Sequence, residues 1–281
     1  MGEGGRPVAI VTGGAGGMGL ATARILGRDH RVVLGDLGRE RIDAAVAALA
    51  GEGIDATGSV CDVTDRRSVA DLFASAPGVR AVVHTAGVSP QMGSPERIVR
   101  INALGTVHVV EAALEVAGDG FALVNVASSA GHMLPKLLAP TRAYKLSTSD
   151  PAAFTDRLTK AAGRGPRRGR SGAAYAMSKN FVQWYSARMA EAFGARGARI
   201  LSVSPGSFDT EMGRLEDKAG AGALADNSAL GRFGRPEEIA ELLAFCASDR
   251  PGYLTGVDIL CDGGSGARMT LKDKIAMARG A

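Results

Sequence analysis

Cysteine is scarce in this chain of 281 residues, and its positions form no recognisable pattern. Cys61, Cys246 and Cys261 include no CxxC pair and no metal-ligand spacing. An odd number of cysteines in a long chain is typical of reduced cytosolic thiols. We therefore expect no bound metal and a cytoplasmic location.

Long hydrophobic runs are also missing. No run approaches the ~20 apolar residues of a membrane span, and the glycine-rich stretch from Met1 to Pro7 lacks the apolar segment of a signal peptide. The sequence thus predicts no membrane partner.

Neither sign of charge dominates, since the chain contains 33 Lys and Arg and 29 Asp and Glu and has a formal net charge of +4. Much of the excess lies in Arg164–Arg170, a loop-like cluster without interleaved aromatic residues. Such a cluster favours a solvated loop, and we expect no nucleic-acid partner. Salt-sensitive binding of DNA or RNA through these arginines is the alternative.

What the chain does contain is a regular alternation of two patterns. Short β-branched apolar runs predict strands at residues 8–11, 31–35, 56–61, 81–84, 122–126, 199–203 and 257–260. Amphipathic stretches predict helices at residues 17–27, 39–50, 68–75, 95–116, 174–193 and 236–247. The alternation predicts an α/β fold with a doubly wound parallel sheet of seven strands and helices on both faces. Without an internal repeat or linker, residues 1–281 are expected to form a single domain.

A glycine-rich turn, TGGAGGMG at Thr12 to Gly19, follows the first predicted strand and leads into a helix. Glycines let the backbone turn tightly and approach a pyrophosphate, whose charge is favoured by N–H groups at the helix start. A plain connector is the alternative, but this setting predicts dinucleotide binding at Gly13, Gly17, Met18 and Gly19.

Asp36 ends the second predicted strand, where a carboxylate can accept hydrogen bonds from both adenosine ribose hydroxyls. The same charge would repel a 2′-phosphate. No arginine lies between Gly13 and Gly19, and Leu37 follows Asp36. These features favour NAD over NADP, although Arg39 is close enough in sequence to weaken the inference. Simple loop capping is the alternative role for Asp36.

Tyr175 and Lys179 are four residues apart in a predicted helix and therefore share a face. A tyrosine titrates near pH ~10, so it is a poor acid or base at neutral pH unless a positive charge favours its phenolate. Lys179 can supply that charge. Taken alone, the pair also fits two residues on a solvated helix.

In combination, these motifs resemble the short-chain dehydrogenase/reductase family from about Pro7 to Gly264. The matching pieces in chain order are TGGAGGMG, Asp36, Asp62 with Val63, Ala86 with Gly87, Asn102, Ser128, Tyr175 with Lys179, Pro205 with Gly206 and Thr210, and Asp262-Gly263-Gly264. The resemblance implies a Rossmann-type fold in which cofactor and substrate meet at the carboxyl ends of the strands.

The resemblance also implies four catalytic residues. Tyr175 exchanges a proton with the substrate oxygen, and Lys179 lowers the tyrosine pKa and binds the nicotinamide ribose. Ser128 hydrogen-bonds the same oxygen and steadies its developing charge. Asn102 helps to hold a water-linked proton path to Lys179.

Further cofactor contacts follow from the same resemblance. Asp62 is expected near the adenine amino group and Val63 against the ring, while Ala86 and Gly87 line the cofactor. The segment from Pro205 through Gly206 and Phe208 is expected to meet the nicotinamide carboxamide, with Thr210 as its side-chain partner. Ordinary turn chemistry is the alternative for each.

Two departures lie near the middle of the chain. His84 stands where family members usually have asparagine, and we interpret it as a satisfied core histidine, or a brace for the sheet, without a chemical role. The connection from Gly87 to Asn102 is shorter than in most members. Part of the connecting helix is therefore expected to be trimmed.

The largest departure is an insertion at about residues 132–173, between Ser128 and Tyr175. Within it, Asp150 and Pro151 predict a capped helix that continues to Ala162. Four apolar residues of the insertion are expected to roof a substrate pocket or to cover a subunit surface: Leu137, Leu138, Phe154 and Leu158. A solvent-side excursion is the alternative for its arginine-rich end. A C-terminal extension from about residue 265 contains a second possible helix at residues 271–277.

The short connection and the insertion resemble the family branch that contains 3α-hydroxysteroid dehydrogenase/carbonyl reductase and coniferyl alcohol dehydrogenase. In that branch the insertion interferes with one of two usual subunit contacts, so we expect a homo-oligomer, with a dimer favoured over a tetramer. The predicted function is NAD-dependent oxidoreduction of a hydrophobic secondary alcohol or ketone, steroid-like compounds included. A non-catalytic NAD(H)-binding sensor on the same fold is the alternative.

Overall fold

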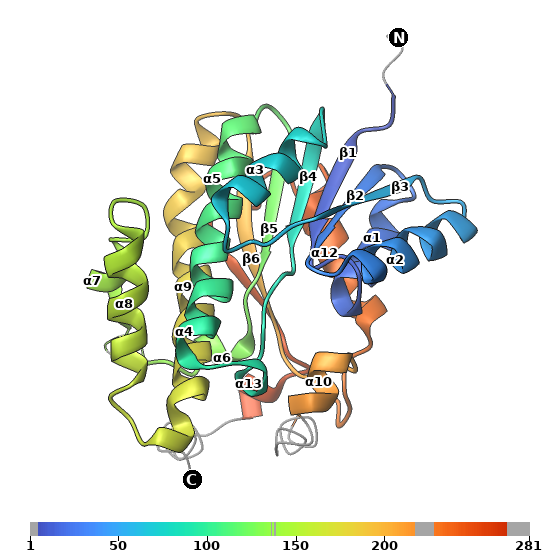
Figure 1. Ribbon diagram of the computed structural model, residues 1–281. Coiled ribbons are helices and arrows are strands. Elements are labelled where there is room, and N and C mark those ends of the chain that lie inside the picture. The colour runs from blue at the N-terminus through green and yellow to red at the C-terminus, as the bar shows by residue number, and fades with distance from the viewer. Residues whose placement is uncertain (1–4, 136, 138, 217–227, 269–281) are drawn as a thin grey trace.

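A single parallel sheet organises the computed structural model, which describes residues 5–135, 137, 139–216 and 228–268. Its strands run in the order β3-β2-β1-β4-β5-β6-β7 (Figure 1), and every neighbouring pair is parallel. The predicted seven-stranded, doubly wound sheet is confirmed.

The central strands are buried along their whole length because helices cover both faces of the sheet. The strands are β1 (Val8–Thr12), β2 (Arg31–Asp36), β3 (Ala56–Val60), β4 (Val79–His84), β5 (Ala122–Val126), β6 (Arg199–Pro205) and β7 (Asp258–Cys261). Each lies within two residues of its predicted bounds.

The covering helices form two layers with separate apolar cores. One layer contains α1 (Gly17–Leu26), α2 (Arg39–Gly51) and α12 (Pro236–Ala247). The opposite layer contains α3 (Arg66–Ala74), α5 (Gly105–Val116) and α9 (Arg170–Gly194). Because all strands are parallel, their carboxyl ends lie together at one end of the sheet, between the two helix layers. Ligands bind at this end in open α/β sheets.

The predicted helix over residues 95–116 is interrupted. A 3₁₀ turn at Pro90–Met92 is followed by α4 (Pro95–Ile98), a π-helical turn at Val99–Leu104 and then α5. A π-helical turn inserts an extra residue into the ladder of backbone hydrogen bonds, and such turns are frequent at functional sites. The turn here contains Asn102, whose side chain forms hydrogen bonds with the backbone of Val88, outside the helix.

The insertion forms α7 (Thr141–Tyr144), α8 (Pro151–Ala162) and a 3₁₀ turn at Arg167–Gly169. The predicted cap is confirmed, because the Asp150 carboxylate accepts a hydrogen bond of 2.9 Å from the Ala153 backbone N–H and Pro151 is the first helical residue. Arg170, expected in a loop, already belongs to α9.

The apolar residues of the insertion do not act as expected. α8 lies on the side of α9 that faces away from the sheet (Figure 1), and Phe154 and Leu158 are fully buried in the core beside α9. They therefore neither roof a pocket nor offer a surface to another subunit. Leu137 is 98% exposed, and Leu138 lies outside the described residues.

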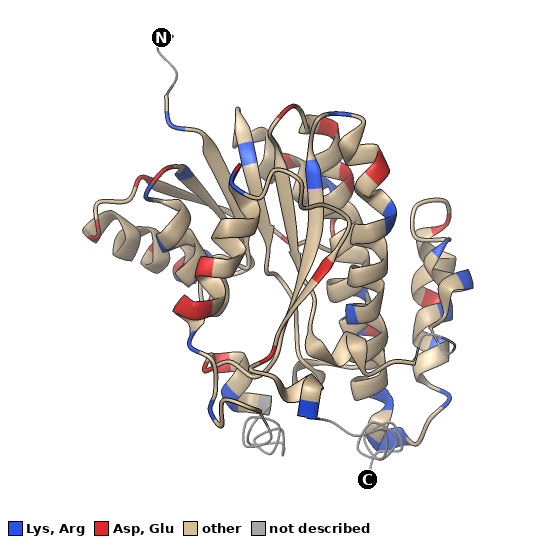
Figure 2. Cartoon of the chain, turned by 180° about the vertical axis from the view of Figure 1, so that it is seen from behind, with Lys and Arg blue, Asp and Glu red and all other residues tan. Residues whose placement is uncertain are grey.

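Three short helices, α6 (Ser129–His132), α10 (Glu211–Glu216) and α13 (Ser265–Arg268), follow the carboxyl ends of β5, β6 and β7. The predicted helix at residues 271–277 lies outside the described residues. Acidic and basic residues are interspersed over the helices and loops (Figure 2). In the described part of the chain, no helix combines the length and apolarity needed to cross a membrane.

Candidate active site

The glycine-rich turn joins β1 to α1 and is closely packed beneath. Gly13 and Gly17 have φ values of +66° and +52°, which favour glycine. A Cβ on Gly13 would lie 2.8 Å from the Ala86 nitrogen, and one on Gly19 would lie 2.3 Å from the Gly13 carbonyl oxygen. Met18 packs on the apolar core beside α1. The turn therefore requires Gly13 and Gly19 for close packing, and Gly13 and Gly17 for their backbone conformation.

Asp36 lies at the end of β2, directly beside this turn. One of its carboxylate oxygens accepts a hydrogen bond of 3.2 Å from the Ala15 N–H, and the other accepts one of 2.8 Å from the Leu37 N–H. The Leu37 side chain is exposed. The carboxylate thus caps its loop, the alternative role, and at the same time presents a negative charge at the edge of the turn.

The arginine nearest the turn is Arg41, not Arg39. Arg39 pairs with Asp43 at 3.6 Å on the surface of α2. The Arg41 guanidinium instead reaches Gly16, where a Cβ would lie 2.8 Å from the Arg41 Nη2 atom. The sequence pattern points to Arg39 because it is closer to Asp36 along the chain, whereas the direction of side chains on a helix brings Arg41 to the turn.

Asn102, Gly87 and Lys179 meet where β4 ends. The Asn102 amide donates to the Val88 carbonyl oxygen at 2.9 Å, and its oxygen accepts from the Val88 N–H at 2.8 Å. A Cβ on Gly87 would lie 3.2 Å from the Asn102 oxygen and 3.4 Å from the Lys179 Nζ atom. Glycine at this position therefore leaves space between Asn102 and Lys179.

Lys179 is buried, and a buried ammonium group needs hydrogen-bonding or charged partners. Its Nζ atom donates to the Val126 carbonyl oxygen at 2.9 Å, at the end of β5. The same atom lies over the face of the Tyr175 ring, 6.0 Å from the ring centre. The helical spacing thus does bring the phenol and the ammonium together, with Lys179 buried and Tyr175 half-buried rather than both on a solvated face.

Ser128 follows β5 and caps α6, where its Oγ atom accepts a hydrogen bond of 3.2 Å from the Ala130 N–H. Two α9 residues hold this segment. Gln183 donates to the Ser128 carbonyl oxygen at 3.2 Å, and Asn180 donates to the Gly131 carbonyl oxygen at 3.0 Å. Sequence reasoning missed both, although Gln183 lies four residues after Lys179 and so shares its face of the helix.

The insertion also reaches this network. The buried Tyr144 hydroxyl lies 3.0 Å from both the Met177 carbonyl oxygen and the Asn180 side-chain oxygen. Burial raises the pKa of Tyr144, so the phenol stays protonated and donates. The insertion is therefore connected to the helix that carries Tyr175 and Lys179.

His84 is a satisfied core histidine that braces the sheet, as predicted. Its ring nitrogens lie 2.7 Å from the Thr12 Oγ1 atom on β1 and 3.2 Å from the Thr106 Oγ1 atom on α5. Burial, with a smaller contribution from the charge of Lys179, lowers the pKa of His84 to about 3. The ring is therefore neutral at physiological pH.

The segment after β6 folds back toward the glycine turn. A Cβ on Gly17 would lie 3.7 Å from the Thr210 side chain, so the two loops are neighbours. Gly206 packs on Asp262, and Pro205 ends β6. The Phe208 side chain is buried against Gly234 rather than facing the turn. Thr210 is thus the side chain of this segment that lies beside the turn.

Asp62 and Val63 follow β3. One Asp62 oxygen accepts a hydrogen bond of 2.8 Å from the Thr64 N–H, which is ordinary turn chemistry. The Val63 side chain is buried beside Gly105, where a Cβ would lie 2.7 Å from it. Their expected contacts with adenine stay predictions.

A nicotinamide dinucleotide fits this arrangement. The missing side chain at Gly13 lets the turn pack on Ala86, and the missing side chains at Gly17 and Gly87 keep space beside Thr210 and beside Asn102 and Lys179, along the path at the carboxyl ends of β1 and β4. Asp36 and Lys179 supply charged groups at the two ends of that path. Within the described residues, no group of three His, Cys, Asp or Glu side chains is placed to hold a metal ion.

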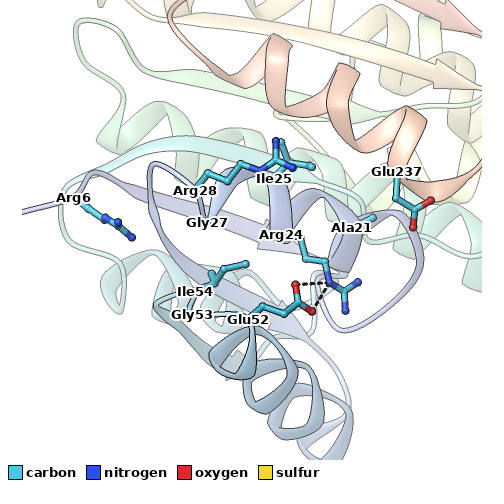
Figure 3. A pocket seen from close by; sticks show the side chains of 10 residues that line it. All are labelled: Arg6, Ala21, Arg24, Ile25, Gly27, Arg28, Glu52, Gly53, Ile54 and Glu237. Carbon is cyan, nitrogen blue, oxygen red and sulfur yellow. Dashed lines mark hydrogen bonds and ion pairs between the residues drawn. The ribbon is translucent and has the colours of Figure 1, made fainter.

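A separate hollow of about 460 Å³ lies at the opposite end of the strands, near their amino ends (Figure 3). It is lined by the end of α1, by Arg6 before β1 and by the turn after α2, and Arg24 pairs there with Glu52 at 2.8 Å. Because these segments adjoin the amino ends of β1 and β2, the hollow is remote from Tyr175 and Lys179.

Comparison with known proteins identifies relatives over nearly the whole chain. The family described as short chain dehydrogenase matches residues 7–148, and the family described as enoyl-(acyl carrier protein) reductase matches residues 158–266. The short-chain dehydrogenase/reductase bsc3 of Alternaria brassicicola is 31% identical over 275 residues, which cover 91% of this chain and 94% of the relative.

Two further relatives span similar lengths. The cis-4-hydroxycyclohexanecarboxylate dehydrogenase of Sinomonas cyclohexanicum is 31% identical over 273 residues, with 92% of this chain and 95% of the relative covered. The crystal structure of gox2181 superposes with a TM-score of 0.73 at 26% identity and covers 93% of this chain and 96% of that one.

Proposed function

Because this chain belongs to the short-chain dehydrogenase/reductase family, we propose that it is an NAD-dependent oxidoreductase that interconverts a hydrophobic secondary alcohol and its ketone. The observation that carries the proposal is that the Lys179 Nζ atom lies over the Tyr175 ring and, together with Asn102, beside Gly87. A buried ammonium group beside a phenol favours the phenolate and so lowers the pKa of that proton donor. Hydride exchange with a carbonyl compound requires such a donor.

The cofactor is held by three parts of the chain in this proposal. The turn from Gly13 to Gly19 takes the pyrophosphate, Asp36 takes the adenosine ribose, and Lys179 takes the nicotinamide ribose. Asp36 favours NAD over NADP because its carboxylate would lie against a 2′-phosphate. When bound, the nicotinamide supplies or accepts the hydride.

The protein's own residues handle the proton. Tyr175 donates its phenolic proton to the oxygen of a ketone, or removes the proton of an alcohol in the opposite direction. Lys179 favours the phenolate by its charge, and Ser128 donates a hydrogen bond to the reacting oxygen. Asn102 links Lys179 to the exterior through a water-borne proton path.

A hydrophobic secondary alcohol is supported by the relative from Sinomonas cyclohexanicum, whose name describes a dehydrogenase of a ring alcohol. Steroid-like compounds extend this class to larger fused rings. We further propose that the protein acts in the cytoplasm, as one catalytic domain over residues 1–281, and that it forms a homo-oligomer.

Replacement of Tyr175 by phenylalanine tests the proposal. Removal of the hydroxyl takes away the proton donor but keeps the ring, so we expect turnover of a working substrate to fall by about a thousandfold, within the range typical of general acid–base groups. The binding constant for NADH, measured by fluorescence titration, is expected to change less than threefold. The matched control is Tyr253→Phe, because Tyr253 is fully exposed.

Two results would contradict the proposal. Near-normal turnover by Tyr175→Phe would show that another group moves the proton. A chain that binds NADH but turns over no member of a broad panel of alcohols and ketones would favour the non-catalytic sensor.

A further inference from the structure

The Arg41 guanidinium occupies the space that a side chain at position 16 would fill. Position 16 lies inside the glycine-rich turn, and a Cβ there would come within 2.8 Å of the Arg41 Nη2 atom. The turn itself contains no basic residue. A positive charge that the turn lacks in sequence is therefore supplied to it from α2.

Two glycines allow this placement. Arg41 is the third residue of α2, and helical side chains point back toward the amino end of their helix. Its Cδ atom passes 3.6 Å from where a Cβ on Gly38 would lie, and its guanidinium then reaches Gly16. Neither glycine presents a side chain that would block the path.

The charge is available for a ligand. The other basic residue of this helical turn, Arg39, pairs with Asp43 at 3.6 Å, whereas no ion pair or hydrogen bond of the Arg41 side chain is found among the described residues. Arg41 is also exposed, so it can swing toward an arriving anion without breaking a contact of the core.

The neighbouring group on the other side of the turn is the Asp36 carboxylate. It accepts a hydrogen bond from the Ala15 N–H, one residue before Gly16. The edge of the turn therefore carries one negative and one positive side chain, Asp36 and Arg41. An adenosine 2′-phosphate at this edge would be repelled by the first and attracted by the second, since arginine is the side chain suited to a phosphate dianion.

We propose that Arg41 is a specificity-determining residue that gives this site a second cofactor: it binds the 2′-phosphate of NADP(H), so the chain accepts NADP(H) as well as NAD(H) despite Asp36. The inference rests on the proposed function, because it requires a dinucleotide at the glycine turn. The expected preference for NAD over NADP then remains, but Arg41 makes it smaller.

Direct binding measurements test this without a substrate. We would titrate the wild type, Arg41→Ala and the control Arg39→Ala with NADH and with NADPH, following nucleotide fluorescence. Arg41→Ala is expected to weaken NADPH binding about tenfold, the scale of one charge-assisted contact with phosphate, and to change NADH binding less than threefold. Arg39→Ala is expected to change neither constant more than twofold, because Arg39 is paired with Asp43.

The outcomes separate this inference from the proposed function. Failure of the wild type to bind either nucleotide would remove the proposed function. Tight NADH binding with no measurable NADPH binding would overturn the role of Arg41 alone. That role would also be overturned if Arg41→Ala weakened both nucleotides equally, or if it left NADPH binding unchanged. Arg41→Lys should keep at least part of the NADPH affinity, because it retains the charge.

Discussion

Among single residues, His84 shows how a departure from a family pattern can be absorbed by the core. Members of the family usually have asparagine at this position. The two ring nitrogens of His84 lie within hydrogen-bonding distance of hydroxyls on β1 and α5. A neutral imidazole can donate at one nitrogen and accept at the other, and each threonine hydroxyl can play the complementary part. Histidine is therefore hydrogen-bonded at both ring nitrogens, and it is a group that titrates.

The buried imidazole should make stability depend on pH. The pKa of His84 is lowered to about 3 in the folded chain, against 6.5 for an ordinary histidine. Its contribution is therefore fully present above pH 6.5 and is lost as the pH falls from there toward 3, because only the unfolded state takes up the proton in that window. At pH 5 the loss is about 2 kcal/mol.

Urea unfolding at pH 7.5 and pH 5 measures this effect. The His84→Asn variant keeps a polar group but removes the titration, so its free energy of unfolding should fall less between the two pH values than that of the wild type. Carboxylates and other histidines contribute equally to both proteins and cancel in the comparison. Parallel pH dependences in the two proteins would show that His84 is not the group responsible.

The residue scale also shows what a sequence pattern can and cannot locate. Spacing alone identifies Tyr175 and Lys179, since four residues on a helix fix a shared face. Arg41 escapes such a pattern because its relation to Gly16 depends on the angle at which α2 leaves β2. Gln183 repeats the spacing of Lys179, so the same rule applied once more along α9 would have found it.

At the scale of elements, the insertion belongs to the core of the protein. Phe154 packs on Phe181 of α9 with ring centres 4.7 Å apart, and Tyr144 packs on the same ring at 5.3 Å. Tyr144 also hydrogen-bonds the backbone of α9 at Met177. The helix with the proposed catalytic pair is thus fixed on its outer side by the insertion and on its inner side by the sheet.

Truncation of Phe154 should therefore destabilise the whole protein. Phe154→Ala leaves a cavity between α8 and α9, and a buried phenylalanine lost in this way costs about 3–5 kcal/mol. The control, Leu137→Ala, removes an apolar side chain of the same insertion that is almost fully exposed, and should change stability by less than about 0.5 kcal/mol. Chemical denaturation of the two variants gives the comparison.

A loss below about 1 kcal/mol for Phe154→Ala would mean that α8 is a loosely attached excursion. In that case the insertion would unfold without α9.

The elements were predictable where local chemistry decides them. Asp150 and Pro151 set the start of α8 because a side-chain cap and a proline at the first position are local signals. The interruption at Val99–Leu104 carries no such signal. It depends on the pairing of Asn102 with the Val88 backbone across the site, a tertiary contact that no periodicity reports.

On the scale of the whole molecule, the alternation of strand and helix patterns was enough to predict the parallel sheet. Parallel strands need a crossover connection, and right-handed crossovers leave few ways to order seven strands. The position of the insertion could not be inferred in the same way, because Phe154 and Leu158 fit a pocket roof and a subunit contact equally well. Burial against α9 in the folded chain decides between them.

That placement limits how two copies of the chain can associate. α8 buries the outer side of α9 within one chain, so this surface of α9 is not available for a second copy. β7 is the last strand of the sheet, and one of its edges pairs with no strand of the described residues. Apolar side chains are exposed there, with Leu260 of β7 at 41% and Val257, the residue before the strand, at 40%. An unpaired apolar edge favours association with another edge.

We therefore predict a dimer that forms through the β7 edge, with a mass twice the 28.8 kDa of one chain. The double variant Val257→Lys with Leu260→Lys places two charges in that contact and should shift the protein to monomers in sedimentation velocity or mass photometry. Val116→Lys, at the exposed end of α5, is the matched control and should leave the dimer intact. A symmetric tetramer built through α9 would contradict the prediction, because α8 would have to leave its place in the core.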